Sequence, residues 1–182
     1  MFGINHFTII CLLLLIVFLS CEDITHMKLS ENEVITFSKT FGSTGDDYGN
    51  CVRQTTDVGY ILTGSTRVCG RGSDVYLVKT DSLGNEQWNS VIGDHCGDGG
   101  NTVIEASDGG FVIIGSSSSF NETGHSDVYL IKTDSSGNTL WERIFGDSGW
   151  DVGEDIIQTD DGGYIIIGYT SSYGAGEYDV YL

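Results

Sequence analysis

The sequence predicts an all-β protein made of repeated four-stranded antiparallel sheets, and three observations lead to this prediction. The first is a repeat of about 52 residues that occurs three times, the last time incompletely. The second is a series of short apolar segments bounded by Gly, Asp, Asn and Ser, which is typical of strands joined by tight turns. The third is that no segment shows the helical spacing of apolar residues.

The repeat is visible in two motifs and one aromatic position. The motif D-V-Y-L-[VI]-K-T-D occurs at 74–81 and 127–134 and begins again at 179–182. An apolar segment that starts and ends with Gly occurs at 59–64, 110–115 and 163–168. Trp88 and Trp141 align with each other and with Phe37, each five residues before a Gly.

Each copy contains four expected strands, which in the second copy are 86–92, 101–107, 110–117 and 127–134. The second and third strands are separated by a hairpin signal, T-D-V-G, S-D-G-G or D-D-G-G. Since Val58 occupies the third position of this turn in the first copy, we expect the positive φ angle at the Gly that follows it in every copy.

The third strand of each copy is apolar throughout, so we expect it to be the most buried and covered on both faces. No helix is available as cover, and sheets stacked face to face satisfy the requirement, as in the blades of a β-propeller. A parallel β-helix is the alternative, disfavoured because its coils are usually shorter and lack tight hairpins.

The motifs carried by residues 88–138 resemble the tandem β-propeller repeats of secreted and lipoprotein-type bacterial proteins. Residues 134–141 also resemble the tryptophan-docking repeat of quinoprotein-like propellers. The resemblance implies three blades, at 34–85, 86–138 and 139–182, the last incomplete. Because propellers normally have four to eight blades, we expect the sequence to be part of a longer protein.

The composition excludes one class of partner. The chain of 182 residues carries a formal net charge of -18, and its eight Lys and Arg residues are scattered singly. Nucleic-acid binding needs clustered cations, so we expect no nucleic-acid partner.

The N-terminus has the pattern of a secretion signal. An uncharged apolar run at 7–19 is followed by Ser20 and Cys21, which predicts a signal peptide over 1–20, with a short uncleaved anchor as the alternative. Residues 17–21 resemble a bacterial lipobox, and Glu22-Asp23 resembles the export signal of surface lipoproteins. The resemblance implies lipid on Cys21, a linker over 21–33, and an extracytoplasmic outer-membrane or cell-surface lipoprotein that meets the membrane through its lipid alone.

Three cysteines then remain, an odd number for an oxidising compartment. In a propeller the loops holding Cys69 and Cys96 lie side by side on neighbouring blades. We therefore expect a disulfide between these two residues, with Cys51–Cys69 as the alternative pair.

Two sets of residues are candidates for binding. Asp47, Asp98 and Asp151 recur in Gly-rich loops, where they either brace the turn or hold Ca²⁺, and turn bracing is favoured. Phe120, Trp150 and Tyr173 lie in loops of unequal length and either stack on a ligand or fill the loop. No cofactor other than Ca²⁺ is expected, and no His or Cys spacing indicates a transition-metal site.

These observations favour a non-catalytic lipoprotein that presents a β-propeller for binding a protein or a glycan. Two alternatives remain open: an accessory region of a secreted polysaccharide hydrolase, and a quinoprotein-like scaffold for envelope assembly. No pair of carboxylates stands out as a glycosidase would require.

Overall fold

The computed structural model describes residues 37–67, 72–94, 97–119 and 124–182. Within these ranges the chain forms eleven β-strands and no helix, and hence no helix long and apolar enough to cross a membrane. The prediction of an all-β chain with three antiparallel sheets is confirmed. The predicted signal peptide, Cys21, Cys69, Cys96 and Phe120 lie outside the described residues.

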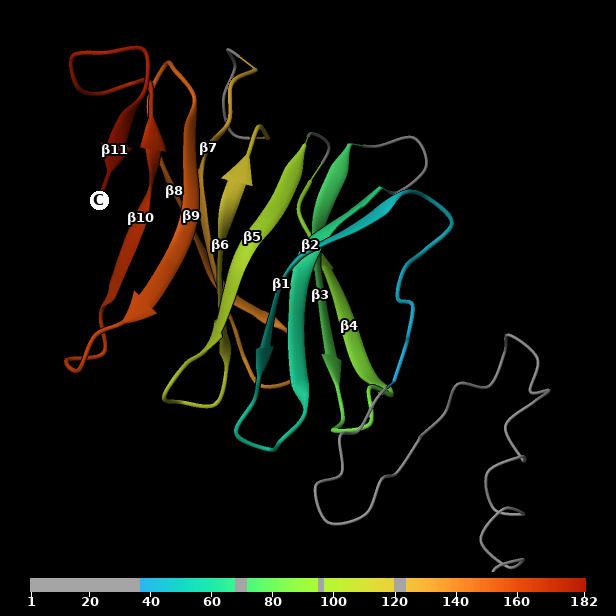
Figure 1. Ribbon diagram of the computed structural model, residues 1–182. Coiled ribbons are helices and arrows are strands. Elements are labelled where there is room, and N and C mark those ends of the chain that lie inside the picture. The colour runs from blue at the N-terminus through green and yellow to red at the C-terminus, as the bar shows by residue number, and fades with distance from the viewer. Residues whose placement is uncertain (1–36, 68–71, 95–96, 120–123) are drawn as a thin grey trace, which may run out of the picture. The chain divides into compact units, whose positions relative to one another are not determined.

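Each sheet is an antiparallel meander in which successive strands are neighbours (Figure 1). The first sheet contains β1 (Asp47–Gln54), β2 (Tyr60–Arg67), β3 (Ser73–Thr80) and β4 (Glu86–Ile92). The second sheet contains β5 (Asp98–Glu105), β6 (Phe111–Ser117), β7 (Asp127–Thr133) and β8 (Thr139–Phe145). The third sheet contains β9 (Asp151–Gln158), β10 (Tyr164–Thr170) and β11 (Asp179–Tyr181).

The grouping of strands differs by one strand from the grouping that the repeat predicts. The repeat pattern places 86–92 in one sheet with the strands that follow it, but β4 pairs with β3, where Trp88 lies opposite Lys79. A tight turn causes this pairing, because the Asp81 N–H donates to the Asn85 carbonyl at 2.9 Å and folds β4 back onto β3. Each complete sheet therefore takes its fourth strand from the beginning of the next repeat.

The hairpin turns place their positive φ angle one residue earlier than the sequence predicts. Val58, Gly109 and Gly162 have φ angles of 62°, 80° and 85°. The Gly that follows is needed for a different reason: a Cβ on Gly59 or Gly110 would stand 2.2 Å from the carbonyl oxygen of Thr80 or Thr133. Close approach of the neighbouring strand, rather than backbone angle, selects Gly at this position.

Two apolar cores lie between the three sheets, one at each junction. The first joins Ile61, Val75 and Leu77 of the first sheet to residues of the second sheet, including Phe111 and Ile113. The second core joins the opposite face of the second sheet to the third sheet, with the following buried members: Ala106, Val112, Ile114, Val128, Leu130 and Ile156. The sheets thus stack in series, and the described residues form no closed ring of sheets.

The prediction that the third strand of each repeat is the most buried is only partly correct. β6 is buried along nearly its whole length, but so is its neighbour β7. β10 alternates between half-buried and exposed residues, because no sheet in the described chain covers its outer face. Burial therefore depends on having a sheet on each side, and within the described ranges only the second sheet has this.

Candidate functional site

A polar groove opens where β2 and β6 end and β3, β5 and β7 begin, in the upper part of Figure 1. Its volume is about 330 Å³. The wall, which we call the serine groove, consists of five serines, three glycines, one aspartate and one tryptophan: Ser65, Ser73, Ser116, Ser118, Ser126, Gly97, Gly99, Gly124, Asp98 and Trp150. Since a hydroxyl both donates and accepts hydrogen bonds, this wall suits a ligand that is itself rich in hydroxyls.

Asp98 holds together two segments that border the groove. It begins β5 and is 2% exposed. Its Oδ2 accepts the backbone N–H of Asp94 at 3.0 Å, and both carboxylate oxygens lie 3.0 Å from the Ser119 hydroxyl. The carboxylate therefore ties the segment before β5 to the segment after β6, which holds two sides of the groove in place.

Gly97 keeps space open between two of the serines. The Ser118 hydroxyl accepts the Gly97 N–H and donates to the Gly97 carbonyl, both at 3.0 Å. A Cβ on Gly97 would stand 3.3 Å from the Ser118 Oγ and 3.8 Å from the Ser73 Oγ. A larger residue at position 97 would therefore fill the region between the two hydroxyls.

Trp150 forms the aromatic edge of the groove. Its backbone N–H donates to the Ser171 Oγ at 2.7 Å, and its ring lies 5.2 Å from the ring of His125. The His125 Nδ1 is in turn 2.6 Å from the Ser148 carbonyl oxygen. The backbone hydrogen bond and the contact with the His125 ring thus hold Trp150 in place. Trp150 nevertheless remains 42% exposed beside the serines.

The three recurring aspartates brace their loops in the same way. Asp47, Asp98 and Asp151 each accept the backbone N–H of the residue four positions earlier, at 2.8, 3.0 and 3.1 Å. Asp151 also accepts hydrogen bonds from the hydroxyls of Thr170 and Ser172. In the part of the chain that the structure describes, no three His, Cys, Asp or Glu residues are grouped so as to hold a metal ion.

Of the three aromatic residues that were candidates for stacking on a ligand, Trp150 and Tyr173 lie in the described ranges, and they differ in position. Trp150 lines the serine groove, whereas Tyr173 does not. The Tyr173 hydroxyl donates to the Gly146 carbonyl at 3.1 Å, and its ring lies 5.7 Å from the ring of Tyr181. Tyr173 therefore packs against the segment that follows β8 and against β11, while Trp150 lines the groove.

Cys51 lies in β1 as a free, half-buried thiol. Its alternative partner Cys69 lies outside the described residues, so the Cys51–Cys69 alternative is not tested. The Cys69–Cys96 bridge lies outside the described residues and stays a prediction.

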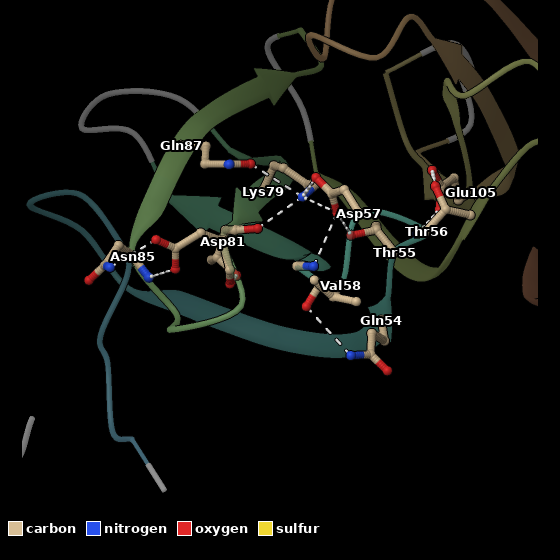
Figure 2. Close-up of polar contacts among 12 residues, drawn as sticks. Gln54, Thr55, Thr56, Asp57, Val58, Lys79, Asp81, Asn85, Gln87 and Glu105 are labelled. Carbon is tan, nitrogen blue, oxygen red and sulfur yellow. Dashed lines mark hydrogen bonds and ion pairs between the residues drawn. The ribbon is translucent and has the colours of Figure 1, made fainter. Parts of the chain in front are cut away.

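A second polar cluster lies at the other end of β2, at the β1–β2 turn (Figure 2). The Lys79 side chain is 6% exposed, and its Nζ donates to both carboxylate oxygens of Asp57, at 3.0 and 2.8 Å. It also donates to the Thr80 carbonyl at 2.9 Å and the Gln87 Oε1 at 3.2 Å. The hydrogen bond from Lys79, followed by that from Thr55, lowers the pKa of Asp57 to about 2.

This cluster is repeated, which indicates a structural role. Lys132 and Asp108 occupy the equivalent positions of the second repeat, with the Nζ 2.8 Å from the carboxylate and 2.9 Å from the Thr133 carbonyl. The hydrogen bond from Lys132 also lowers the pKa of Asp108. Each lysine therefore ties the hairpin turn to the adjoining strand of its own sheet.

Sequence reasoning identifies Trp150 and Asp98 but misses the serines of the groove. Ser65 and Ser73 lie on the paired strands β2 and β3, whereas Ser126 precedes β7 of the second sheet, so its meeting with them depends on the stacking of the two sheets. The run Ser116–Ser119 at the end of β6 is the one local signal that points to this region.

No protein family model matches the chain, and none of the curated proteins matches it.

Proposed function

We propose that this chain is a binding module that takes a neutral, hydroxyl-rich glycan in the serine groove. The observation that supports this proposal is the meeting of five serines with an exposed, anchored tryptophan on one groove of about 330 Å³. Sugar rings present hydroxyls at their edges and C–H groups on their faces, so a wall of hydroxyls beside an aromatic ring matches both.

Binding is favoured over catalysis because the carboxylate in the groove already has a structural task. Asp98 is held by one backbone N–H and by the Ser119 hydroxyl, and it is almost fully buried. A glycosidase needs two carboxyl groups on opposite sides of the scissile bond, and among the described residues Asp98 is the one carboxylate in the wall of the groove.

The test is a titration with neutral oligosaccharides, namely hexamers of glucose in β-1,4 and β-1,3 linkage and of mannose, followed by calorimetry. We expect at least one to bind, and both Trp150→Ala and Gly97→Val to weaken that binding at least about tenfold. Tyr48→Ala is the matched control, because Tyr48 is an exposed aromatic residue outside the groove. Binding that survives both groove substitutions would show that the site is elsewhere.

We further propose that the three sheets are propeller-type blades displayed outside the cytoplasm by lipid on Cys21. The apolar run at 7–19 that ends at Ser20-Cys21 supports this proposal. Mass spectrometry of the mature chain should show an acylated Cys21 as the first residue. The Cys21→Ser variant should no longer be recovered with the membrane fraction. Recovery of an intact segment 1–20 on the mature chain would contradict it.

A further inference from the structure

A second polar pocket adjoins the serine groove on the first sheet. Its volume is about 300 Å³, and we call it the arginine pocket because one of its described residues is an arginine. The wall consists of six residues: Asp46, Tyr48, Ser65, Arg67, Gly72 and Ser73. Ser65 and Ser73 also belong to the wall of the serine groove, so the two pockets are adjacent. A linear ligand that lies in the groove can therefore continue into this pocket.

The arginine pocket is the first repeat's counterpart of the groove. Five of its six residues have their repeat equivalents in the wall of the serine groove. Both serines are kept, and the three positions that differ are Asp46 for Gly97, Tyr48 for Gly99 and Arg67 for Ser118. Where the groove is small and neutral, the arginine pocket therefore carries one charge of each sign.

The pocket lies at the covered face of the first sheet. Along β2, Ser65 and Arg67 alternate onto the same face as Ile61, which is buried against the second sheet. Ser73 shares a face of β3 with the buried Val75 in the same way. The equivalent positions of the second sheet form the serine groove although that sheet is packed on both faces. The pocket is therefore a feature of the repeat and does not depend on an uncovered face.

The Arg67 side chain is exposed and available to a ligand. Its backbone N–H donates to the Asp46 carbonyl at 2.9 Å, which holds the backbone of both residues in place. Within the described ranges its guanidinium takes part in no ion pair or hydrogen bond, although the Asp46 carboxylate belongs to the same pocket. Lys79 and Lys132, by contrast, are buried and paired with aspartates. Arg67 thus presents an uncommitted guanidinium beside the groove.

We propose that the glycan in the serine groove continues into the arginine pocket with a uronic acid unit, whose carboxylate pairs with Arg67. The inference rests on the proposed function and names the sugar that follows the neutral part of the ligand. A guanidinium offers parallel N–H groups that match the two oxygens of a carboxylate, and the charge strengthens both hydrogen bonds. Ser65 and Ser73, which line both pockets, can bond the hydroxyls of the sugars on either side.

A single acidic unit, rather than a chain of them, fits the charges of the protein. The chain carries a net charge of -18, and Asp46 stands in the wall of the arginine pocket. The described wall of the serine groove contains no cation, and its one charged residue is Asp98. A second carboxylate on the ligand would therefore meet repulsion without a guanidinium to pair with. We expect a mainly neutral glycan with one acidic unit to bind best.

The test compares neutral and acidic hexamers by calorimetry on the full chain at about 0.15 M salt, which screens long-range repulsion. The probes are the hexamers of glucose in β-1,4 and β-1,3 linkage and of mannose. Each is used unmodified and with the primary alcohol of one terminal unit, at either end in turn, oxidised to a carboxylate. We expect one acidic hexamer to bind about fivefold tighter than its neutral parent, as an exposed ion pair allows. Neutral hexamers form no ion pair with Arg67, so we expect their affinity to depend on the serine groove alone.

Arg67→Gln should abolish the preference for the acidic hexamer and leave the affinity for its neutral parent unchanged. Arg53→Gln is the matched control, because Arg53 is an exposed arginine outside both pockets and its replacement changes the net charge equally. Asp46→Asn should increase the preference, because it removes a repulsive charge from the wall. A damaged fold would weaken the binding of both hexamers and cannot produce these opposite changes.

The outcomes separate this inference from the proposed function. A neutral hexamer that binds while neither acidic form binds tighter would overturn the inference and leave the proposed function standing. A preference that survives Arg67→Gln, or that Arg53→Gln removes equally, would also overturn it. Binding of acidic hexamers alone, lost in Arg67→Gln, would support the arginine pocket and contradict the neutral ligand of the groove. Binding of no hexamer of either kind would overturn both proposals.

Chemical protection locates the acidic unit independently. Phenylglyoxal modifies exposed guanidinium groups, and peptide mass spectrometry reports the modification of each arginine. The preferred acidic hexamer should slow the modification of Arg67 and leave that of Arg53 unchanged, while its neutral parent should protect Arg67 less. Equal rates at Arg67 with and without the acidic hexamer would contradict the proposed ion pair.

Discussion

The second and third sheets have nearly the same sequence pattern and very different surroundings. β6 and β10 share an apolar core segment flanked by Gly, yet β6 is buried along nearly its whole length and β10 is exposed at every second residue. The difference comes from neighbours, since the second sheet has a sheet on each side and the third has one. In a repeat protein, a residue's contribution to stability therefore depends on its place in the stack.

The largest expected effect is the difference in the free energy of unfolding between substitutions at two equivalent isoleucines. Ile114 is fully buried between the second and third sheets, whereas Ile167 is about half exposed. Ile114→Ala removes buried methyl groups and leaves a cavity, and it should lower the free energy of unfolding by about 3 kcal/mol. Ile167→Ala should lower it by less than about 1 kcal/mol.

Urea unfolding monitored by circular dichroism measures both values. Equal losses for the two variants would mean that the outer face of the third sheet is covered in solution.

A smaller difference in stability is expected between substitutions at the hairpin aspartates. Asp57 pairs with the buried Lys79, whereas Asp161 of the third repeat accepts bonds from the Thr159 hydroxyl and the Gly163 N–H. Asp57→Ala leaves the Lys79 ammonium with only the Thr80 carbonyl and Gln87 as described acceptors. Because the Asp57 side chain is 55% exposed, we expect a loss of about 1 to 2 kcal/mol rather than the full cost of an unpaired buried charge.

Asp161→Ala should cost less than Asp57→Ala, since no buried charge loses its partner. Thermal unfolding of the two variants side by side makes this comparison. A larger loss for Asp161→Ala would show that the hydrogen bonds within the turn, and not the lysine, hold the hairpin.

The sequence predicts the strands well because the repeat supplies the same information three times. Turn residues, apolar segments and the aligned tryptophans place all eleven strands. It misplaces the fourth strand of the two four-stranded sheets, because a repeat shows which segments recur and does not show where one sheet ends. It also assigns the positive φ angle to the wrong hairpin position, since Gly59 is selected by the Thr80 carbonyl of a different strand.

The serine groove lies beyond sequence reasoning for a related reason. Its residues come from both of the first two sheets and from the segment before β9, so they meet only when the sheets are stacked. Asp98 could be found because it recurs in every repeat. Ser65 recurs as Ser116 and Ser73 as Ser126, but the third copy has Tyr169 and Tyr178 at these positions, and the recurrence does not show that the two pairs meet.

The smallest expected effect is the pH dependence of the Asp57 contribution. Its pKa of about 2 in the folded chain lies below the ordinary value of 3.8, so the folded state favours the ionised carboxylate. The resulting stability is fully present above about pH 4 and is lost as the pH falls from 4 toward 2.

Many other carboxylates titrate in this window, so the unsubstituted chain must be compared with Asp57→Asn, which keeps the shape and removes the charge. The difference in melting temperature between the two proteins should be constant from pH 7 to about pH 5 and shrink toward pH 2.5. A difference that stays constant down to pH 2.5 would show that the Lys79–Asp57 pair contributes shape and hydrogen bonding without a charge-dependent part.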